Sequence, residues 1–175
     1  MFLGVRGSTP APGSAFVGVG GNTSCIAVAH DDQPPSLILD AGTGLRRLGQ
    51  LLGEAPFCGS ILLSHLHWDH VQGLPFCPAV DRPDARVALW LPEQGDTVTV
   101  LARGLSPPHF PIGPDGLGGD WQFLGMEAGR RGVVEGFDVL ALDVPHKGGR
   151  TFGYRISDGH RSVAYLPDHA TGAGL

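Results

Sequence analysis

The most constraining feature of the sequence is the run Ser64-His65-Leu66-His67-Trp68-Asp69-His70, which directly follows three apolar residues at 61–63. In an extended segment alternate residues face the same way, so His65, His67 and Asp69 can converge while the residues between them pack behind. A helix that begins near Asp69 would place this carboxylate at a positive helix N-terminus and would turn His70 toward a neighbouring point. The run therefore predicts two adjacent metal positions at the end of a strand.

Imidazole and carboxylate ligands suit zinc, and they also suit iron and manganese, so the ligand set alone does not select the metal. The competing interpretation is that these are unrelated polar residues on a loop. With 8 histidines in 175 residues, this order arises by chance on the order of once in a thousand such chains, which favours a metal site.

Short apolar segments between turn-forming residues predict a chain dominated by strands, since 28 glycines and 15 prolines interrupt the sequence. The expected strands are residues 2–5, 25–29, 37–40, 60–64, 86–91, 138–144, 151–156 and 162–166. An amphipathic helix is expected at 43–52, with Thr43 as its N-cap and Gly53 just past its end, and a shorter one at 97–103. The glycine- and proline-rich stretch 106–120 is expected to be a long surface loop.

Size and composition predict one domain over residues 1–175, because domains commonly span ~100–200 residues. Hydrophobic residues make up 42% of the chain, enough for a sizeable core. Seventeen acidic residues outnumber twelve basic ones, giving a net charge of −5, and no Lys/Arg cluster is present, so nucleic acid is disfavoured as a partner. No apolar run is long enough to cross a membrane and no signal peptide is evident, so a cytoplasmic protein is expected. Its three separated cysteines are then expected to be buried and reduced.

The segment His65-Leu66-His67-Trp68-Asp69-His70 resembles the H-x-H-x-D-H signature of the metallo-β-lactamase superfamily, and the following Gly73-Leu74-Pro75 is similar to its phosphodiesterase and RNase Z-like branch. Other stretches that fit this branch are Gly4-Val5-Arg6-Gly7-Ser8-Thr9-Pro10, Gly20-Gly21-Asn22-Thr23-Ser24 and Leu39-Asp40-Ala41-Gly42-Thr43-Gly44. His146 with Phe152-Gly153-Tyr154-Arg155-Ile156 resembles its third metal motif, and Tyr165-Leu166-Pro167-Asp168 resembles the stretch around its bridging aspartate.

The resemblance implies an α/β fold, the four-layer αββα metallo-β-lactamase sandwich, with the site at one edge between the sheets. It implies two divalent metal ions, with zinc preferred and manganese or iron as alternatives. The implied ligands are His65, His67 and His146 on one metal, Asp69 and His70 on the other, and Asp168 bridging both. Asp69 is also the expected catalytic residue, because it could orient the metal-bridging hydroxide that acts as nucleophile, whereas Asp40 is expected to hold ligands or its loop.

One departure from the family concerns the end of the chain. The family supplies a further metal histidine near its C-terminus, whereas this sequence ends at Leu175 after an irregular segment at 170–174. The sandwich is therefore expected to be incomplete at the C-terminus, with the second metal lacking one protein ligand. His169 is an open candidate next to Asp168, and His109 on the long loop is expected at the surface.

The expected function is hydrolysis of a small or cyclic phosphodiester by two metal ions. The expected partner is thus a small phosphodiester, with a second copy of the chain, in a homodimer, as a further candidate. Alternatives are an RNase Z-like tRNA 3′-processing endonuclease, a thioester or lactone hydrolase, a mononuclear iron oxygenase and an inactive metal-binding fragment. Net acidity argues against the RNA substrate.

Overall fold

The computed structural model describes residues 1–53 and 55–170, and its core consists of two facing β-sheets. The first sheet has six strands in sequence order: β1 (Phe2–Gly4), β2 (Cys25–Val28), β3 (Leu37–Leu39), β4 (Cys58–Leu62), β5 (Arg86–Pro92) and β6 (Asp120–Met126). The second sheet has the order β10 (Ser162–Tyr165), β9 (Phe152–Ser157), β8 (Phe137–Asp143) and β7 (Arg131–Val134). Strands β3 to β6 run parallel, and every pair in the second sheet is antiparallel.

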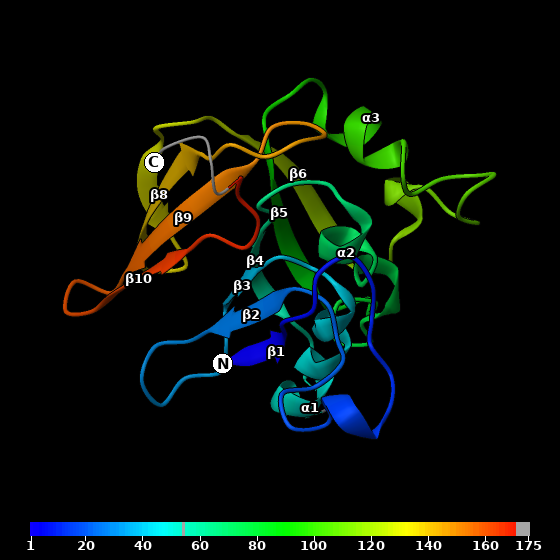
Figure 1. Cartoon of the computed structure of the whole chain (residues 1–175), viewed down its shortest axis with the longest axis horizontal. Coiled ribbons are helices and arrows are strands. Elements are labelled where there is room, and N and C mark those ends of the chain that lie inside the picture. Colours follow the sequence, from blue (N-terminus) through cyan, green and yellow to red (C-terminus); the bar gives the residue numbers. More distant parts are fainter. Residues whose placement is uncertain (54, 171–175) are drawn as a thin grey trace.

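Short helices connect the strands of the first sheet and lie on its outer face (Figure 1). The α-helices are α1 (Leu48–Leu52), α2 (Trp68–Val71) and α3 (Thr97–Ala102). The 3-10 helices are η1 (Ser14–Phe16), η2 (Thr43–Arg47), η3 (Leu74–Phe76) and η4 (Pro114–Gly116). Parallel strands need such crossovers, which explains why the helices gather on this side.

Two hydrophobic cores follow from the alternation of side chains along the strands. In β3, Leu37 and Leu39 face the second sheet, whereas Ile38 faces the helices. The core between the sheets contains Phe137, Phe152 and Tyr154 from the second sheet, all at most 3% exposed. A strand that contributes to both cores is buried on both faces, as expected at the centre of a layered fold.

The two sheets and the helices that cover the first one agree with the predicted αββα sandwich. Within the described residues the second helical layer is not seen, and Val133 and Leu142 on the outer face of the second sheet are 70% and 52% exposed. The irregular tail expected at 170–174 lies, from Thr171 onward, outside the described residues. No helix in the described part of the chain is long and apolar enough to span a membrane.

All eight predicted strands are present within one or two residues of their predicted ends, but β6 and β7 were not predicted. Strand β6, Asp-Trp-Gln-Phe-Leu-Gly-Met, contains no β-branched residue, and β7, Arg-Gly-Val-Val, has only four residues. Pairing with β5 and β8 therefore defines these strands more than their local pattern does.

The predicted helix at 43–52 divides into η2 and α1, and Thr43 is not an N-cap as predicted; that position belongs to Gly42. The Thr43 hydroxyl instead accepts a hydrogen bond from the backbone N–H of Thr23 at 2.8 Å, and the Thr23 hydroxyl accepts one from the N–H of Thr43 at the same distance. This reciprocal pair ties the segment after β3 to the segment before β2.

Candidate metal centre

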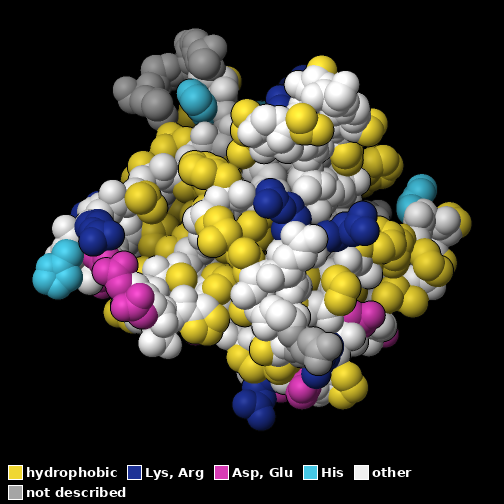
Figure 2. Space-filling view, turned by 90° about the horizontal axis from the view of Figure 1, so that it is seen from below, with side chains coloured by type: hydrophobic (Ala, Val, Ile, Leu, Met, Phe, Trp, Pro, Cys, Tyr) yellow, Lys and Arg dark blue, Asp and Glu magenta, His cyan; other side chains and the backbone are white. Residues whose placement is uncertain are grey.

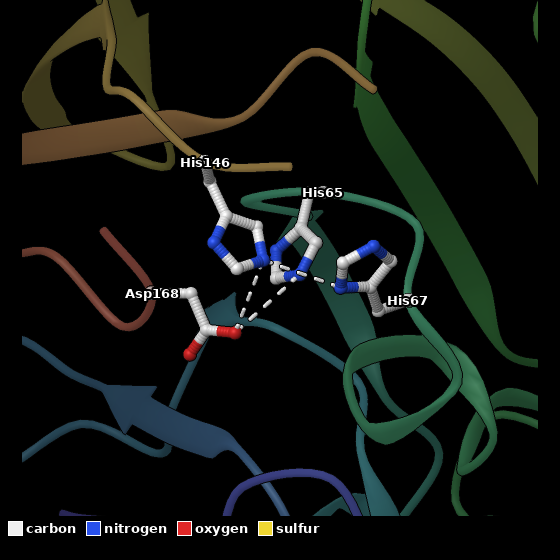
Figure 3. A group of neighbouring side chains, drawn as sticks. All are labelled: His65, His67, His146 and Asp168. Carbon is white, nitrogen blue, oxygen red and sulfur yellow. Dashed lines mark hydrogen bonds and ion pairs between the residues drawn. The ribbon is translucent and has the colours of Figure 1, made fainter. Parts of the chain in front are cut away.

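Two groups of histidine and aspartate side chains meet at one edge of the sandwich. The first group is His65, His67, His146 and Asp168 (Figure 3), and the second is Asp69, His70 and Asp168. Within each group one ligand atom from every residue lies within 4.8 Å of all the others. The sequence had predicted all six residues, and the structure brings all six together, with Asp168 common to both groups.

The distances show how closely the groups converge on Asp168. Its Oδ2 lies 3.8 Å from His65 Nε2, 3.5 Å from His146 Nε2 and 3.8 Å from His70 Nε2. Nε2 of His146 also lies 3.3 Å from Nδ1 of His67. A single carboxylate oxygen therefore stands between the two groups, as a bridging ligand would.

Both sheets contribute to the site. Residues 65–70 follow β4 and lead into α2, which begins at Trp68 with His67 as its N-cap. His146 and Asp168 lie on loops that follow β8 and β10 of the second sheet. Strand ends on a rigid scaffold hold such loops in place, which is why residues far apart in the sequence can form one site.

The buried Asp40 orients the histidines from behind. Its Oδ2 lies 2.7 Å from His70 Nδ1 and accepts a 2.8 Å hydrogen bond from the Ser64 hydroxyl, while Oδ1 accepts one from the Ser64 N–H at 2.6 Å. Because the Ser64 hydroxyl donates to Asp40, its oxygen is left to accept from His65 Nδ1, 3.0 Å away. Both histidines then carry their proton on Nδ1 and present Nε2 as a lone pair. The predicted role of Asp40 as a residue that holds ligands agrees with these contacts.

Tyr165 supports Asp40 from the second sheet. Its hydroxyl donates a 2.7 Å hydrogen bond to Asp40 Oδ2, and its oxygen lies 3.4 Å from Ser24 Oγ, whose hydroxyl can donate to it. Burial and the nearby Asp40 charge raise the pKa of Tyr165 well above its usual value, so the hydroxyl keeps its proton. Strand β10 thus helps to fix ligands that belong to the first sheet.

Asp69 is held by the N-terminal segment. Its Oδ2 accepts a 2.6 Å hydrogen bond from the backbone N–H of Ser8 and lies 3.3 Å from His70 Nε2. Ser8 has a φ of 62°, in the left-handed region, and this conformation is part of the turn that directs its N–H at the carboxylate.

The pKa values of the two buried histidines, His65 and His70, are shifted in opposite directions. Burial, aided by the charge of His70, lowers the pKa of His65 from 6.5 to about 3. Burial also lowers the pKa of His70, but the hydrogen bond that His70 donates to Asp40 and the charges of Asp40, Asp69 and Asp168 outweigh this effect and raise the pKa. His65 is therefore neutral across the physiological range, whereas the surroundings of His70 favour its protonated form more than water does.

The residues fit a pair of cations on a structural ground independent of the motif. Nε2 of His65 and Nε2 of His70 are buried, and neither has a hydrogen-bond partner among the described residues. Leaving such atoms unsatisfied costs about 1–3 kcal/mol each. Both atoms point toward Asp168, so cations between them and the carboxylates would satisfy them at once.

The remaining candidates lie elsewhere. His169 is exposed and belongs to neither group. His109 is exposed, as expected, and lines a cavity beside the centre. The prediction that Trp68 packs behind the ligands was wrong, because its side chain is 69% exposed. Helix α2 begins at Trp68, so the two-residue alternation of an extended segment ends at His67.

Three contributors were not singled out as site residues from the sequence: Ser64, Tyr165 and the N–H of Ser8. Ser64 and Tyr165 stand inside or beside motifs that were recognised, and a polar residue next to a ligand is the signal that could have found them. The Ser8 contact uses only the backbone, for which no side-chain signal exists.

Comparisons with known proteins agree with this class of site and fold. The family model described as "Beta-lactamase superfamily domain" matches residues 36–173 of this chain. The chain belongs to this family, and the predicted metallo-β-lactamase fold is thereby confirmed.

Curated relatives include ribonuclease Z of Natronomonas pharaonis, 22% identical over 99% of this chain and 52% of that protein, and ribonuclease Z of Gemmatimonas aurantiaca, 26% identical over the same shares. The chain thus spans about half the length of the curated relatives it matches. Among solved structures, the metallo-β-lactamase fold protein YhfI from Bacillus subtilis matches with a TM-score of 0.64 at 18% identity. The match covers 93% of this chain and 59% of the YhfI chain. A Zn(2+)-bound PqqB from Methylobacterium extorquens matches with a TM-score of 0.55 at 22% identity, over 83% of this chain and 52% of the PqqB chain.

Proposed function

We propose that this chain carries the metal centre of a phosphodiesterase that acts on a small phosphodiester with two zinc ions. The observation that supports this most is Asp168, whose one oxygen lies within 4 Å of Nε2 atoms from both ligand groups. His65, His67 and His146 would hold one ion, and Asp69 with His70 the other. Two such ions lower the pKa of a water between them and stabilise the charge on phosphoryl oxygens.

The chain's own residues prepare this chemistry. Asp40 and Ser64 fix the protons of His65 and His70 on Nδ1, so that the donor atoms face inward before any ligand arrives. Asp69, held by the Ser8 N–H through Oδ2, can accept a hydrogen bond from the attacking water through Oδ1 and orient it. The cysteines are all unpaired, which suits a reducing compartment such as the cytoplasm.

Elemental analysis followed by hydrolysis of bis-p-nitrophenyl phosphate tests the proposal. We expect two metal ions per chain and turnover that is lost with a chelator. Asp69→Asn should lower kcat by about 10²–10⁴-fold, the range typical for a positioned acid or base. Stoichiometric metal without any turnover would support the alternative of a binding fragment and contradict the enzyme.

Ribonuclease Z activity is the second candidate, because both curated relatives quoted above carry that name. RNA binding relies on basic side chains that neutralise phosphates. On the face shown in Figure 2, the Lys and Arg side chains are scattered among hydrophobic ones rather than gathered in a stripe. Incubation with a tRNA precursor separates the two, since cleavage at the 3′ side would favour this candidate over the small phosphodiester.

A further inference from the structure

A cavity lies directly beside the ligand groups. It has a volume of about 610 Å³, within the range of pockets for small ligands. Trp68, between two ligands in sequence, forms part of its wall, and so does Gly148, where an added Cβ would lie 2.5 Å from His67 Nε2. None of the six ligand residues lines the cavity, but Trp68 and Gly148 are neighbours of His67, so a molecule bound here would lie next to the segment that carries the ligands.

Two large aromatic side chains on this wall are strongly exposed. Trp68 is 69% exposed and Phe76 is 56% exposed, which is unusual for such large side chains. Phe76 packs edge to face with Phe110, with ring centroids 5.6 Å apart, so the second ring holds the first in position. An exposed flat ring on each of two segments offers faces against which another planar ring can stack.

The charged side chains of the cavity are all basic. Arg103 and Arg150 line it together with His109, and no Asp or Glu is among its described lining residues, although the chain as a whole has a net charge of −5. Arg150 already donates to Asp143 Oδ1 at 3.0 Å and to the Glu93 carbonyl at 2.9 Å. The Arg103 side chain lies on the exposed end of α3 and has no hydrogen-bond or ion-pair partner within residues 1–53 and 55–170, so its charge is available to an anion.

We infer that this cavity binds a planar aromatic group of an anionic ligand, stacked on Trp68 and Phe76, with Arg103 near the anionic oxygens. This inference rests on the proposed function, because that function places the phosphoryl group of the ligand at the metal centre. The ligand would be a phosphoester with one aromatic arm, either an aryl group or a nucleoside, because both offer a flat π-face. Purely alkyl phosphoesters would leave the aromatic wall unused.

Binding of three phosphate monoesters by calorimetry tests the inference without requiring turnover. The probes are thymidine 5′-phosphate, phenyl phosphate and methyl phosphate, each titrated into the full chain with zinc and without metal. We expect both aromatic esters to bind about tenfold more tightly than methyl phosphate, since stacking of one ring contributes about that factor. Tighter binding of thymidine 5′-phosphate than of phenyl phosphate would identify a nucleoside arm, and the reverse an aryl arm.

Variants connect the preference to named residues. Trp68→Ala should bring the three affinities within about threefold of one another, whereas Phe2→Ala, which removes an aromatic side chain of the same 69% exposure on β1, should keep the tenfold preference. Arg103→Gln should weaken all three anions severalfold. Thermal melting checks that each variant folds, and Phe76→Ala provides a second aromatic variant should Trp68→Ala fail to fold.

The outcomes separate this inference from the function beneath it. Equal affinities for the three esters, or an aromatic preference that survives both Trp68→Ala and Phe76→Ala, would overturn the cavity assignment even in an active enzyme. An aromatic preference in the metal-free chain, combined with zinc that neither binds nor supports hydrolysis, would keep the cavity and reject the phosphodiesterase.

Discussion

A single buried carboxylate, Asp40, determines which ring nitrogens His65 and His70 present to a metal ion. It binds Ser64 and His70 directly and reaches His65 through the Ser64 hydroxyl. The strongest evidence for its role is that Nδ1 of each histidine has a hydrogen-bond partner on the side of Asp40, while neither Nε2 has one among the described residues. Residues that orient ligands in this way commonly change metal affinity by 10–100-fold when they are replaced.

Tyr165→Phe tests this support at the residue scale. The change removes the 2.7 Å hydrogen bond to Asp40 and no ligand atom. We expect zinc affinity to fall by about tenfold, because the carboxylate is then less firmly held. Competition with a chromophoric chelator measures the affinity, and Tyr154→Phe is the matched control, since its hydroxyl binds the Leu63 carbonyl rather than Asp40. An equal loss in both variants would mean that a buried hydroxyl matters only for packing.

The pH dependence of the metal-free protein should report His65. Its pKa is about 3 when folded and 6.5 when unfolded, so between these values the unfolded chain binds a proton that the folded chain does not. The free energy of unfolding therefore falls as the pH is lowered from 6.5 toward 3, by at most about 1.4 kcal/mol per pH unit from this group. The raised pKa of His70 acts in the opposite sense, but in a window above 6.5, because its contribution is complete below that value and is lost as the pH rises through its folded pKa.

Urea titrations in the presence of a chelator at pH 6.5 and at pH 4.5 measure this slope. His65→Gln, which cannot take up a proton, should show a smaller fall than the unmodified chain, and the difference between the two isolates His65 from the carboxylates. Parallel slopes would show that His65 is protonated normally in the folded protein.

Cysteine labelling gives a further test of local burial. The prediction that all three thiols are buried was wrong for Cys58, which is exposed, whereas Cys25 and Cys77 are buried and burial raises the pKa of both thiols. We expect iodoacetamide at pH 8 to modify Cys58 alone in the folded protein and all three thiols in urea, as measured by mass spectrometry. Labelling of Cys25 before unfolding would place that residue outside the core.

At the scale of elements, the segment between β3 and η2 shows why small residues are needed near the site. A Cβ on Gly42 would lie 2.2 Å from the Asp69 carbonyl and 2.4 Å from Thr23 Oγ1. The first of these is backbone, so it cannot move aside easily. Gly42→Ala should destabilise the protein by about 1–3 kcal/mol and displace the segment that carries Asp69.

The matched control for Gly42→Ala is Gly49→Ala in α1, where an added Cβ meets nothing within 4 Å. Alanine has fewer backbone conformations than glycine in the unfolded chain and fits the helical conformation of α1. Gly49→Ala should therefore raise the free energy of unfolding by about 0.4–1 kcal/mol. Thermal or urea unfolding distinguishes the two, and a stable Gly42→Ala protein with unchanged zinc affinity would contradict the packing argument.

The sequence anticipated the elements with strong local patterns and missed those that pairing defines. Runs such as Ile61-Leu62-Leu63 are apolar enough to identify a central strand, whereas β6 and β7 acquire their structure from neighbours. The motif at 65–70 placed four candidate ligands locally. The positions of His146 and Asp168 depend on how the second sheet packs, which only the resemblance, and no local pattern, could suggest. The exposed Trp68 was mispredicted because the start of α2 changed the periodicity.

At the scale of the whole molecule, the metal centre joins the two sheets. Beyond the core between the sheets, the Tyr154 hydroxyl donates to the Leu63 carbonyl at 2.7 Å, and the Phe152 N–H donates to the Ser64 carbonyl at 2.8 Å. These bonds fix the second sheet to the residues just before the ligand motif. Metal bound between residues of both sheets would add a further connection, so binding should stabilise the folded chain as a unit.

Asp168 is where this coupling can be tested, because it is the one described carboxylate shared by both ligand groups. A ligand that binds only the folded state at 100 times its Kd stabilises it by about 2.7 kcal/mol, which in a chain of this size corresponds to a rise of roughly 5–10 °C in Tm. We expect zinc to raise the Tm of the unmodified chain by this amount.

Asp168→Asn should lose most of this increase in Tm and reduce the bound metal from two ions to one or none. The control is Asp138→Asn, at an exposed aspartate on β8 outside both ligand groups, which should behave like the unmodified chain. Calorimetric melting and elemental analysis provide the two measurements. If Asp168→Asn kept both ions and the full increase in Tm, each ligand group would bind its metal independently, and the sheets would be joined by packing and hydrogen bonds alone.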